Sequence, residues 1–92
     1  MKTIQHFVGG KTYSGESKRT GKVFNPATGE QSANVKLASV KDTNEAVSLA
    51  RKAFEGWSNT PPLQRARVMF KFKELIEQNS DELTKIIVQE HG

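Results

Sequence analysis

The 92-residue chain is long enough for one small domain, and its 35% apolar residues make a thin core for that length. It has no cysteine for a disulfide framework, no apolar run near the roughly 20 residues that span a bilayer, and no signal-peptide or presequence pattern, so we expect a cytoplasmic protein without a membrane partner. The net charge of +4 comes from lysines and arginines spread along the chain between acids, which predicts a solvated surface and no nucleic-acid partner.

The chain opens with a predicted β-hairpin. Gln5–Val8 is a short extended run, and Gly9-Gly10 is a hairpin signal that leads into Lys11–Tyr13. A glycine pair can also let a ligand approach the backbone closely. No phosphate-loop pattern and no helix start follow this pair, so a plain turn is favoured.

Two further strands are predicted after an exposed polar loop. They are Lys22–Asn25 and Ser32–Leu37. Pro26–Gly29 between them predicts a turn, because proline fixes one backbone angle and glycine tolerates a positive one. Alternate residues of the second strand share one apolar face: Ala33, Val35 and Leu37.

From Ser39 onward the apolar period changes to that of a helix. Ser39 and Asp42 predict a capping box, in which each side chain accepts a hydrogen bond from the backbone of the other residue. The helix is expected over Thr43–Glu55. Phe54 and Trp57 at its end could be a binding platform, but their helical spacing favours anchors that pack against another element.

Two more helices follow. Thr60 is the predicted N-cap of a helix over Pro62–Gln78, whose first-turn prolines remove no needed donor. Asn79 is a predicted terminator, and Ser80 is the predicted cap of a third helix over Asp81–Glu90. We predict that the large apolar side chains of these helices form one main cluster: Phe54, Trp57, Phe72, Leu75 and Ile76.

Phe70 and Val88 lie outside the apolar stripes of their helices. Either these side chains are exposed, or structure outside this chain covers the helices on more than one side. Both alternatives stay open at this point. The stripes are also wider than three short helices can cover by themselves, which predicts an exposed apolar patch.

Residue types that carry chemistry do not gather at catalytic or metal-binding spacing. The two histidines lack a second ligand at metal spacing, the acid pairs lie on predicted solvated helix faces, and the serines have no neighbouring base. We therefore predict no catalytic, cofactor-binding or metal-binding residue in the chain. The residues considered are His6, His91, Glu74, Glu77, Asp81, Glu82, Ser14, Ser17 and Ser32.

Arg65 is the polar residue that stands out. It lies three residues before Val68 and close to the apolar stripe of its helix, which predicts a partly buried guanidinium. A buried guanidinium needs backbone carbonyls or a carboxylate as acceptors. A structural role is favoured over ligand binding, and both stay open.

Several short motifs occur in a fixed order along nearly the whole chain. They are His6–Lys11, Val23–Glu30, Leu37–Ser39, Glu45–Val47, Ala53-Phe54 with Trp57, Thr60–Leu83 and Glu90–Gly92. In this order they resemble the opening of the aldehyde dehydrogenase superfamily. The last two are similar to the bacterial methylmalonate-semialdehyde dehydrogenases, the branch that transfers the acyl group to coenzyme A.

The resemblance implies the N-terminal scaffold segment of a larger α/β enzyme. We expect an α+β fragment, with strands and loops over residues 1–38 and helices over residues 39–92, that is joined to the remainder of the same enzyme in a homotetramer. The resemblance also implies that the whole enzyme uses NAD and coenzyme A to convert methylmalonate or malonate semialdehyde into an acyl-CoA and NADH, in valine and inositol catabolism.

In that family a cysteine thiolate attacks the aldehyde. This chain has no cysteine, so no catalytic or cofactor residue is carried over to it. The segment alone is expected to be inactive and to bind neither cofactor.

Three other classes stay open. The chain could belong to another NAD(P)-dependent aldehyde dehydrogenase, it could be a small non-enzymatic binding module, or it could be a basic nucleic-acid binder. A compact monomer that melts cooperatively would indicate the binding module. An affinity that falls steeply with salt would indicate the nucleic-acid binder.

Overall fold

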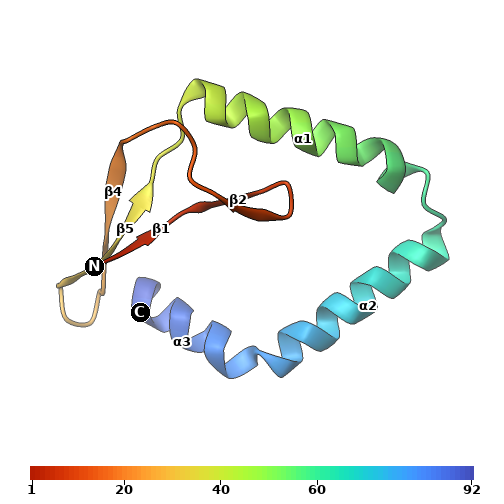
Figure 1. Ribbon diagram of the computed structural model, residues 1–92. Coiled ribbons are helices and arrows are strands. Elements are labelled where there is room, and N and C mark those ends of the chain that lie inside the picture. The colour runs from red at the N-terminus through yellow and green to blue at the C-terminus, as the bar shows by residue number, and fades with distance from the viewer.

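The computed structural model describes residues 1–92 and has five strands followed by three helices (Figure 1). The strands are β1 (Lys2–Ile4), β2 (His6–Val8), β3 (Lys11–Tyr13), β4 (Thr20–Phe24) and β5 (Gln31–Lys36). The helices are α1 (Val40–Ser58), α2 (Pro62–Gln78) and α3 (Ser80–His91). This is the predicted α+β order, and each helix begins and ends within three residues of its predicted bounds.

The sequence did not predict β1. It pairs in parallel with β5, which also pairs with the antiparallel β4, so the sheet has the order β1-β5-β4. Lys2 of β1 lies opposite Ala33 of β5. β5 is distant from β1 in the sequence, so their pairing leaves no local hairpin signal. The three residues of β1, next to the short strand β2, were therefore not predicted as a strand.

The hairpin of β2 and β3 confirms the predicted plain turn at Gly9-Gly10. Val8 and Lys11 are paired, so the two glycines form a two-residue loop. Their φ angles are 64° and 79°, as a type I′ turn requires of both central residues. The turn brings Gly9 close to α1, because a Cβ added there would lie 3.3 Å from Cδ1 of Leu49.

The predicted capping box at the start of α1 is present. The Ser39 hydroxyl accepts the Asp42 N–H at 3.0 Å, and the Asp42 carboxylate accepts the Ser39 N–H at 3.0 Å. The predicted cap at Thr60 is wrong. Its hydroxyl donates to the Gly56 carbonyl at the end of α1, and Pro61 precedes α2 without a side-chain cap.

The cap predicted at Ser80 is also wrong, because Ser80 is already the first residue of α3. Asn79 is the single residue between α2 and α3, and it ends α2 as predicted. Its side-chain amide donates to the Leu75 carbonyl at 2.8 Å, so it serves the helix before it and does not cap the helix after it.

The elements follow one another around an open ring, in which α3 returns the C-terminus to the sheet (Figure 1). A Cβ added to Gly92 would lie 3.6 Å from Cγ of Pro26. The Cα atoms span 47 × 35 × 15 Å, and the three helices follow one another around the ring without stacking (Figure 1). The radius of gyration is 16.8 Å, against about 12 Å for a compact domain of this length. The chain is therefore a single layer.

The predicted main cluster is wrong for this chain. Its five members, Phe54, Trp57, Phe72, Leu75 and Ile76, are 42–55% exposed. The physical reason is that the helices lie end to end in one layer, so no second layer covers their apolar faces.

The predicted exposed apolar patch is confirmed. Only Ala33 and Asp42 are buried, and both Phe70 and Val88 are exposed. The accessible surface is 7577 Å², against about 5300 Å² for a compact monomer of this mass. No helix combines the length and hydropathy needed to cross a membrane.

Candidate functional site

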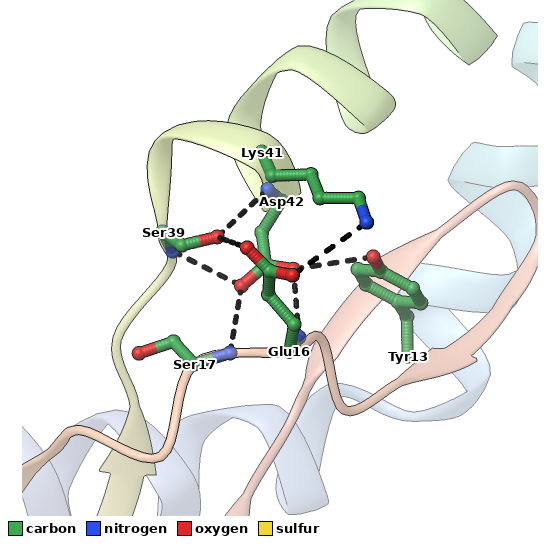
Figure 2. A network of polar contacts seen from close by, with 6 residues as sticks. All are labelled: Tyr13, Glu16, Ser17, Ser39, Lys41 and Asp42. Carbon is green, nitrogen blue, oxygen red and sulfur yellow. Dashed lines mark hydrogen bonds and ion pairs between the residues drawn. The ribbon is translucent and has the colours of Figure 1, made fainter.

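The most ordered polar site in the chain centres on Asp42, in the first turn of α1. The capping box holds Asp42 against Ser39 and turns its carboxylate toward the loop between β3 and β4 (Figure 2). The residue is only 2% exposed. A carboxylate is rarely buried so deeply unless it is paired or fully hydrogen-bonded.

Four donors fill the Asp42 carboxylate. Oδ1 accepts the Glu16 N–H at 2.8 Å and the Tyr13 hydroxyl at 3.2 Å. Oδ2 accepts the Ser39 N–H at 3.0 Å and the Ser17 N–H at 3.3 Å. We call these five residues the Asp42 hub, and it fastens the loop after β3 to the start of α1 (Figure 2).

Gly15 makes room for the hub. Its φ is 70°, and a Cβ added there would lie 2.6 Å from Oδ2 of Asp42, closer than real contacts allow. Any other residue would therefore be strained in its backbone and would also collide with the carboxylate. The loop follows this path because glycine lets two successive N–H groups, those of Glu16 and Ser17, point at one acceptor.

The hydrogen bonds and the burial of the hub set the protonation states of Asp42 and Tyr13. The N–H groups of Ser39 and Glu16 lower the pKa of Asp42 far below its usual 3.8, against the opposing effect of desolvation. Desolvation and the bond to Asp42 raise the pKa of Tyr13 above its usual 10.0. At neutral pH the hub is thus a carboxylate beside a neutral phenol.

This arrangement excludes acid–base chemistry at Asp42. Its four hydrogen bonds use the roughly four lone-pair positions of a carboxylate, so none is free for a substrate proton or a metal ion.

The side-chain contacts around the hub, which involve Glu16, are weaker than those to Asp42. Ser39 Oγ donates to Glu16 at 3.2 Å, and Lys41 lies 3.6 Å from Glu16 with both side chains largely exposed, so that ion pair contributes little.

The acidic residues that the sequence set aside are solvated, as predicted. Glu74 lies 3.4 Å from Lys71, and Glu77 lies 2.8 Å from Lys73, on exposed parts of α2. Asp81 and Glu82 are exposed in the first turn of α3, where the helix dipole favours negative charge.

The histidines and serines do not form a reactive group. His6 faces Tyr13 across the first hairpin, with ring centroids 6.3 Å apart, and His91 lies in the last turn of α3. Ser17 contributes its N–H to the hub, and Ser32 donates to a strand carbonyl. The structure contains no group of three or more His, Asp or Glu side chains that could hold a metal ion.

Arg65 is half-buried in the first turns of α2, as the sequence predicted. Its Nε atom is buried and has no hydrogen-bond acceptor, and its guanidinium takes part in no ion pair. The carbonyl or carboxylate partner that the sequence led us to expect is therefore not within this chain.

Sequence reasoning found Asp42 and Ser39 but missed three residues of the hub: Tyr13, Glu16 and Ser17. Tyr13 was predicted only as the end of a hairpin strand, and Glu16 and Ser17 as part of an exposed polar loop. A signal was present. A capping aspartate accepts one hydrogen bond from the N-cap amide, so its other lone pairs need further donors. Gly15 marks a loop position that can take a positive φ, and the amides after it are such donors.

The residues of this chain do not fit a dinucleotide-binding loop. Such a loop needs glycines that lead into a free helix N-terminus. The N-terminus of α1 is occupied by Ser39 and Asp42, α2 begins at Pro62 directly after Pro61, and a single residue separates α3 from α2. We therefore assign no step of nicotinamide chemistry to these residues.

The fold is an α+β layer with one ordered polar junction, the Asp42 hub, at the start of α1. Its family follows from comparison. The model of the aldehyde dehydrogenase family matches residues 13–92, and the chain belongs to that family. Malonate-semialdehyde dehydrogenase of Pseudomonas aeruginosa is 44% identical over 92 residues, which is all of this chain and 18% of that protein.

Solved structures agree over the same span. Methylmalonate-semialdehyde dehydrogenase of Oceanimonas doudoroffii is 52% identical with a TM-score of 0.94, and the match covers 100% of this chain and 19% of that one. A putative methylmalonate-semialdehyde dehydrogenase of Sinorhizobium meliloti, solved in complex with NAD, is 43% identical with a TM-score of 0.96 over the same shares. The chain thus spans about a fifth of the length of these relatives and matches their N-terminal part.

Proposed function

We propose that residues 1–92 are the N-terminal scaffold of an NAD-dependent dehydrogenase that converts methylmalonate or malonate semialdehyde into an acyl-CoA. The observation that carries the proposal is the match of the entire chain, at 52% identity and a TM-score of 0.94, to a methylmalonate-semialdehyde dehydrogenase. Relatives named malonate-semialdehyde dehydrogenase support the same class of substrate.

The segment's own contribution is mechanical. The hub fixes the first hairpin and the β3–β4 loop to the start of α1, and α3 returns the end of the chain to the sheet. In the proposed enzyme, NAD accepts the hydride and coenzyme A accepts the acyl group. The thiol nucleophile must come from outside these residues, since the chain has no cysteine.

Two assays at equal protein concentration test the proposal. The purified 92-residue chain is expected to give no NADH with any aldehyde. The longer polypeptide encoded in frame with it is expected to form NADH from methylmalonate or malonate semialdehyde only when coenzyme A is supplied. Turnover by the short chain would refute the scaffold role, and turnover of the longer protein without coenzyme A would refute the acylating branch.

A second candidate is another aldehyde dehydrogenase of the family. A NAD-dependent benzaldehyde dehydrogenase of Corynebacterium glutamicum is 29% identical with a TM-score of 0.86, and the match covers 94% of this chain. The same scaffold therefore occurs with a different named substrate. Activity of the longer polypeptide with aromatic aldehydes, and none with semialdehydes, would favour this candidate.

The remaining parts of the proposal are a cytoplasmic location and a homotetramer. Size-exclusion chromatography with light scattering would measure the oligomeric state of the longer polypeptide. The non-enzymatic binding module is disfavoured by the single-layer shape, because a self-sufficient module of this size is compact. Cooperative melting of the isolated chain as a compact monomer would instead favour the binding module.

A further inference from the structure

Positive charge is concentrated in the β-strand half of the chain. Residues 1–41 contain seven lysines and arginines but only two acids, which gives a net charge of +5. Residues 42–92 contain seven lysines and arginines and eight acids, which gives a net charge of −1. The cations are spread evenly along the chain, whereas the acids are not. The excess of positive charge therefore belongs to the strands and their loops.

One face of the three-stranded sheet carries part of this charge. Side chains alternate between the two faces of a strand, so Thr20 and Lys22 of β4 share a face, as do Asn34 and Lys36 of β5. Thr20 lies opposite Lys36, and Lys22 lies opposite Asn34. Thr3 of β1, also opposite Asn34, extends the face across the sheet. We call this side the cationic face: Thr3, Thr20, Lys22, Asn34 and Lys36.

The loop before β4 adds another ammonium group beside the cationic face. Lys36 Nζ donates to the Ser17 carbonyl at 2.7 Å, which brings this ammonium group to the residue next to the exposed Lys18. None of the three ion pairs of the chain involves Lys18, Lys22 or Lys36. Like charges that are close together on a sheet are unfavourable unless an anion offsets them.

The opposite face of the sheet is the one that the chain itself begins to cover. It carries Ile4, Val23, Ala33 and Val35, and Ala33 is buried. Gln89 of α3 lines the same small cavity as Ile4 and Ala33, so α3 approaches the sheet from this side. A sheet with one apolar and one polar face packs through the apolar face and keeps the polar face in water. The cationic face therefore remains available to a partner.

We propose that the cationic face binds an extended acidic segment of a partner polypeptide, whose carboxylates face the ammonium groups of Lys18, Lys22 and Lys36. Lys22 and Lys36 are diagonal neighbours across β4 and β5, and such neighbours are about 7–8 Å apart. Alternate side chains of an extended segment are about 7 Å apart. Two carboxylates at positions i and i+2 of the segment therefore match the two lysines, and the resulting hydrogen bonds are charge-assisted.

Nucleic acid and membrane surfaces match the face less well. Single-stranded nucleic acid binds to aromatic side chains on which its bases stack, and arginine forks are favoured for phosphate groups. The cationic face has no aromatic ring, and the guanidinium of the neighbouring Arg19 donates to the Ala38 carbonyl at 2.9 Å. An anionic membrane would be attracted by the lysines alone, because the face has no large apolar side chain to insert.

The test measures how a fluorescein-labelled octaglutamate peptide binds to the longer polypeptide encoded in frame with residues 1–92. Fluorescence anisotropy gives the Kd at low and at high salt, and octaglutamine gives the background. The site variant is Lys18→Gln/Lys22→Gln. Its matched control is Lys71→Gln/Lys73→Gln, which removes the same charge from two lysines that already pair with acids on α2.

Octaglutamate is expected to bind the wild type, and high salt should weaken the binding because it screens exposed charges. The site variant should raise the Kd about fivefold, the loss expected of two exposed ion pairs. The control variant should change it less than about twofold. The interaction lies apart from the reaction proposed above, so NADH formation should be the same in the wild type and the site variant, and the two proposals can fail separately.

Four results would overturn the inference. Absence of octaglutamate binding would show that the face has no affinity for acidic segments. An equal rise of Kd in both variants would assign the binding to net charge and not to this face. An oligothymidylate with the same number of charges that binds more tightly than octaglutamate would make the partner a nucleic acid. Phosphatidylglycerol vesicles that bind the wild type more tightly than octaglutamate does would make it a membrane.

Discussion

The region from β1 to the first turn of α1 surrounds its buried carboxylate with hydrogen-bond donors, whereas α2 and α3 leave their apolar side chains uncovered. The first region contains both buried residues of the chain, Ala33 and Asp42, and the carboxylate there has four donors. The second region has no buried residue, and its one half-buried guanidinium has no acceptor.

The difference shows where each region obtains its stability. Hydrogen bonds to a carboxylate act over short distances, so the first region can be organised by its own sequence. Apolar faces gain free energy only when another surface removes them from water, so the helices depend on a partner. The two regions should therefore respond differently to mutation in the isolated chain and in the complete enzyme.

The largest effect is expected at Phe72, in the complete enzyme. Phe72→Ala should cost about 3–5 kcal/mol of unfolding free energy there, because it removes a ring from a covered face. In the isolated chain Phe72 is 54% exposed, and the same change should leave thermal unfolding followed by circular dichroism nearly unaltered. Lys71→Ala is the matched control, with an effect under about 0.5 kcal/mol in either context. Equal effects of Phe72→Ala in both contexts would contradict the comparison.

The next effect is expected at Asp42, and it should appear in both contexts. Asp42→Asn replaces an acceptor oxygen by an NH2 group that faces backbone donors, so the N–H groups of Glu16, Ser17 and Ser39 lose protection. Amide hydrogen exchange of the isolated chain measures this directly. Glu45→Gln, an exposed change on the same helix, should leave those amides unaltered.

The hub also predicts a dependence on pH. The pKa of Asp42 in the folded chain is lower than its usual 3.8, so its carboxylate stabilises the fold at pH values above about 4 and loses that contribution as the pH falls through the folded value. Protection of the Glu16 and Ser17 amides, corrected for intrinsic exchange, should therefore decline below about pH 4. Protection that stays constant down to pH 2 in the wild type would show that other contacts hold the loop.

A smaller effect is expected at Ala33, in the centre of the sheet. Ala33→Leu should cost about 1–3 kcal/mol in both contexts, because the side chain is 5% exposed and the site has no room for three more carbons. Ser32→Leu adds similar bulk at the neighbouring exposed position and should cost much less. Chemical denaturation of the complete enzyme measures both changes.

The smallest effects are expected at two glycines, and they have opposite signs. Gly56→Ala in α1 should stabilise the helix by about 0.5–1 kcal/mol, since nothing lies within 4 Å of the added Cβ and alanine is the better helix former. Gly29→Ala should destabilise by about 1 kcal/mol although the space there is also open, because its φ is 73°. Helix content and unfolding free energy of the two variants check the pair. Changes of the same sign would show that backbone conformation does not decide these sites.

Local patterns predicted the parts of the fold that depend on local physics. The Gly9-Gly10 turn, the Ser39–Asp42 capping box and the three helices each arise from a few neighbouring residues. The failures have distant or external causes. β1 needs β5 as its partner, and the cluster predicted around Phe72 needs a covering surface that this chain does not have.

The candidate site shows the same division. Ser39 and Asp42 were found because they are three residues apart, whereas Tyr13 lies 29 residues before Asp42. Arg65 was singled out by its place beside an apolar stripe, and its half-burial is confirmed. The carbonyl or carboxylate acceptor that was expected for it is not found in the structure.

The span of the Asp42 hub also has a consequence for synthesis on the ribosome. All its members lie between Tyr13 and Asp42, so every contact is available once residue 42 has emerged. Translation of residues 43–58, which complete α1, takes roughly 1–3 s, while closing a loop of this size takes on the order of a microsecond or less. The nascent chain thus has time to form the Asp42 hub before α1 is complete. The helices that follow then emerge next to a loop that is already ordered.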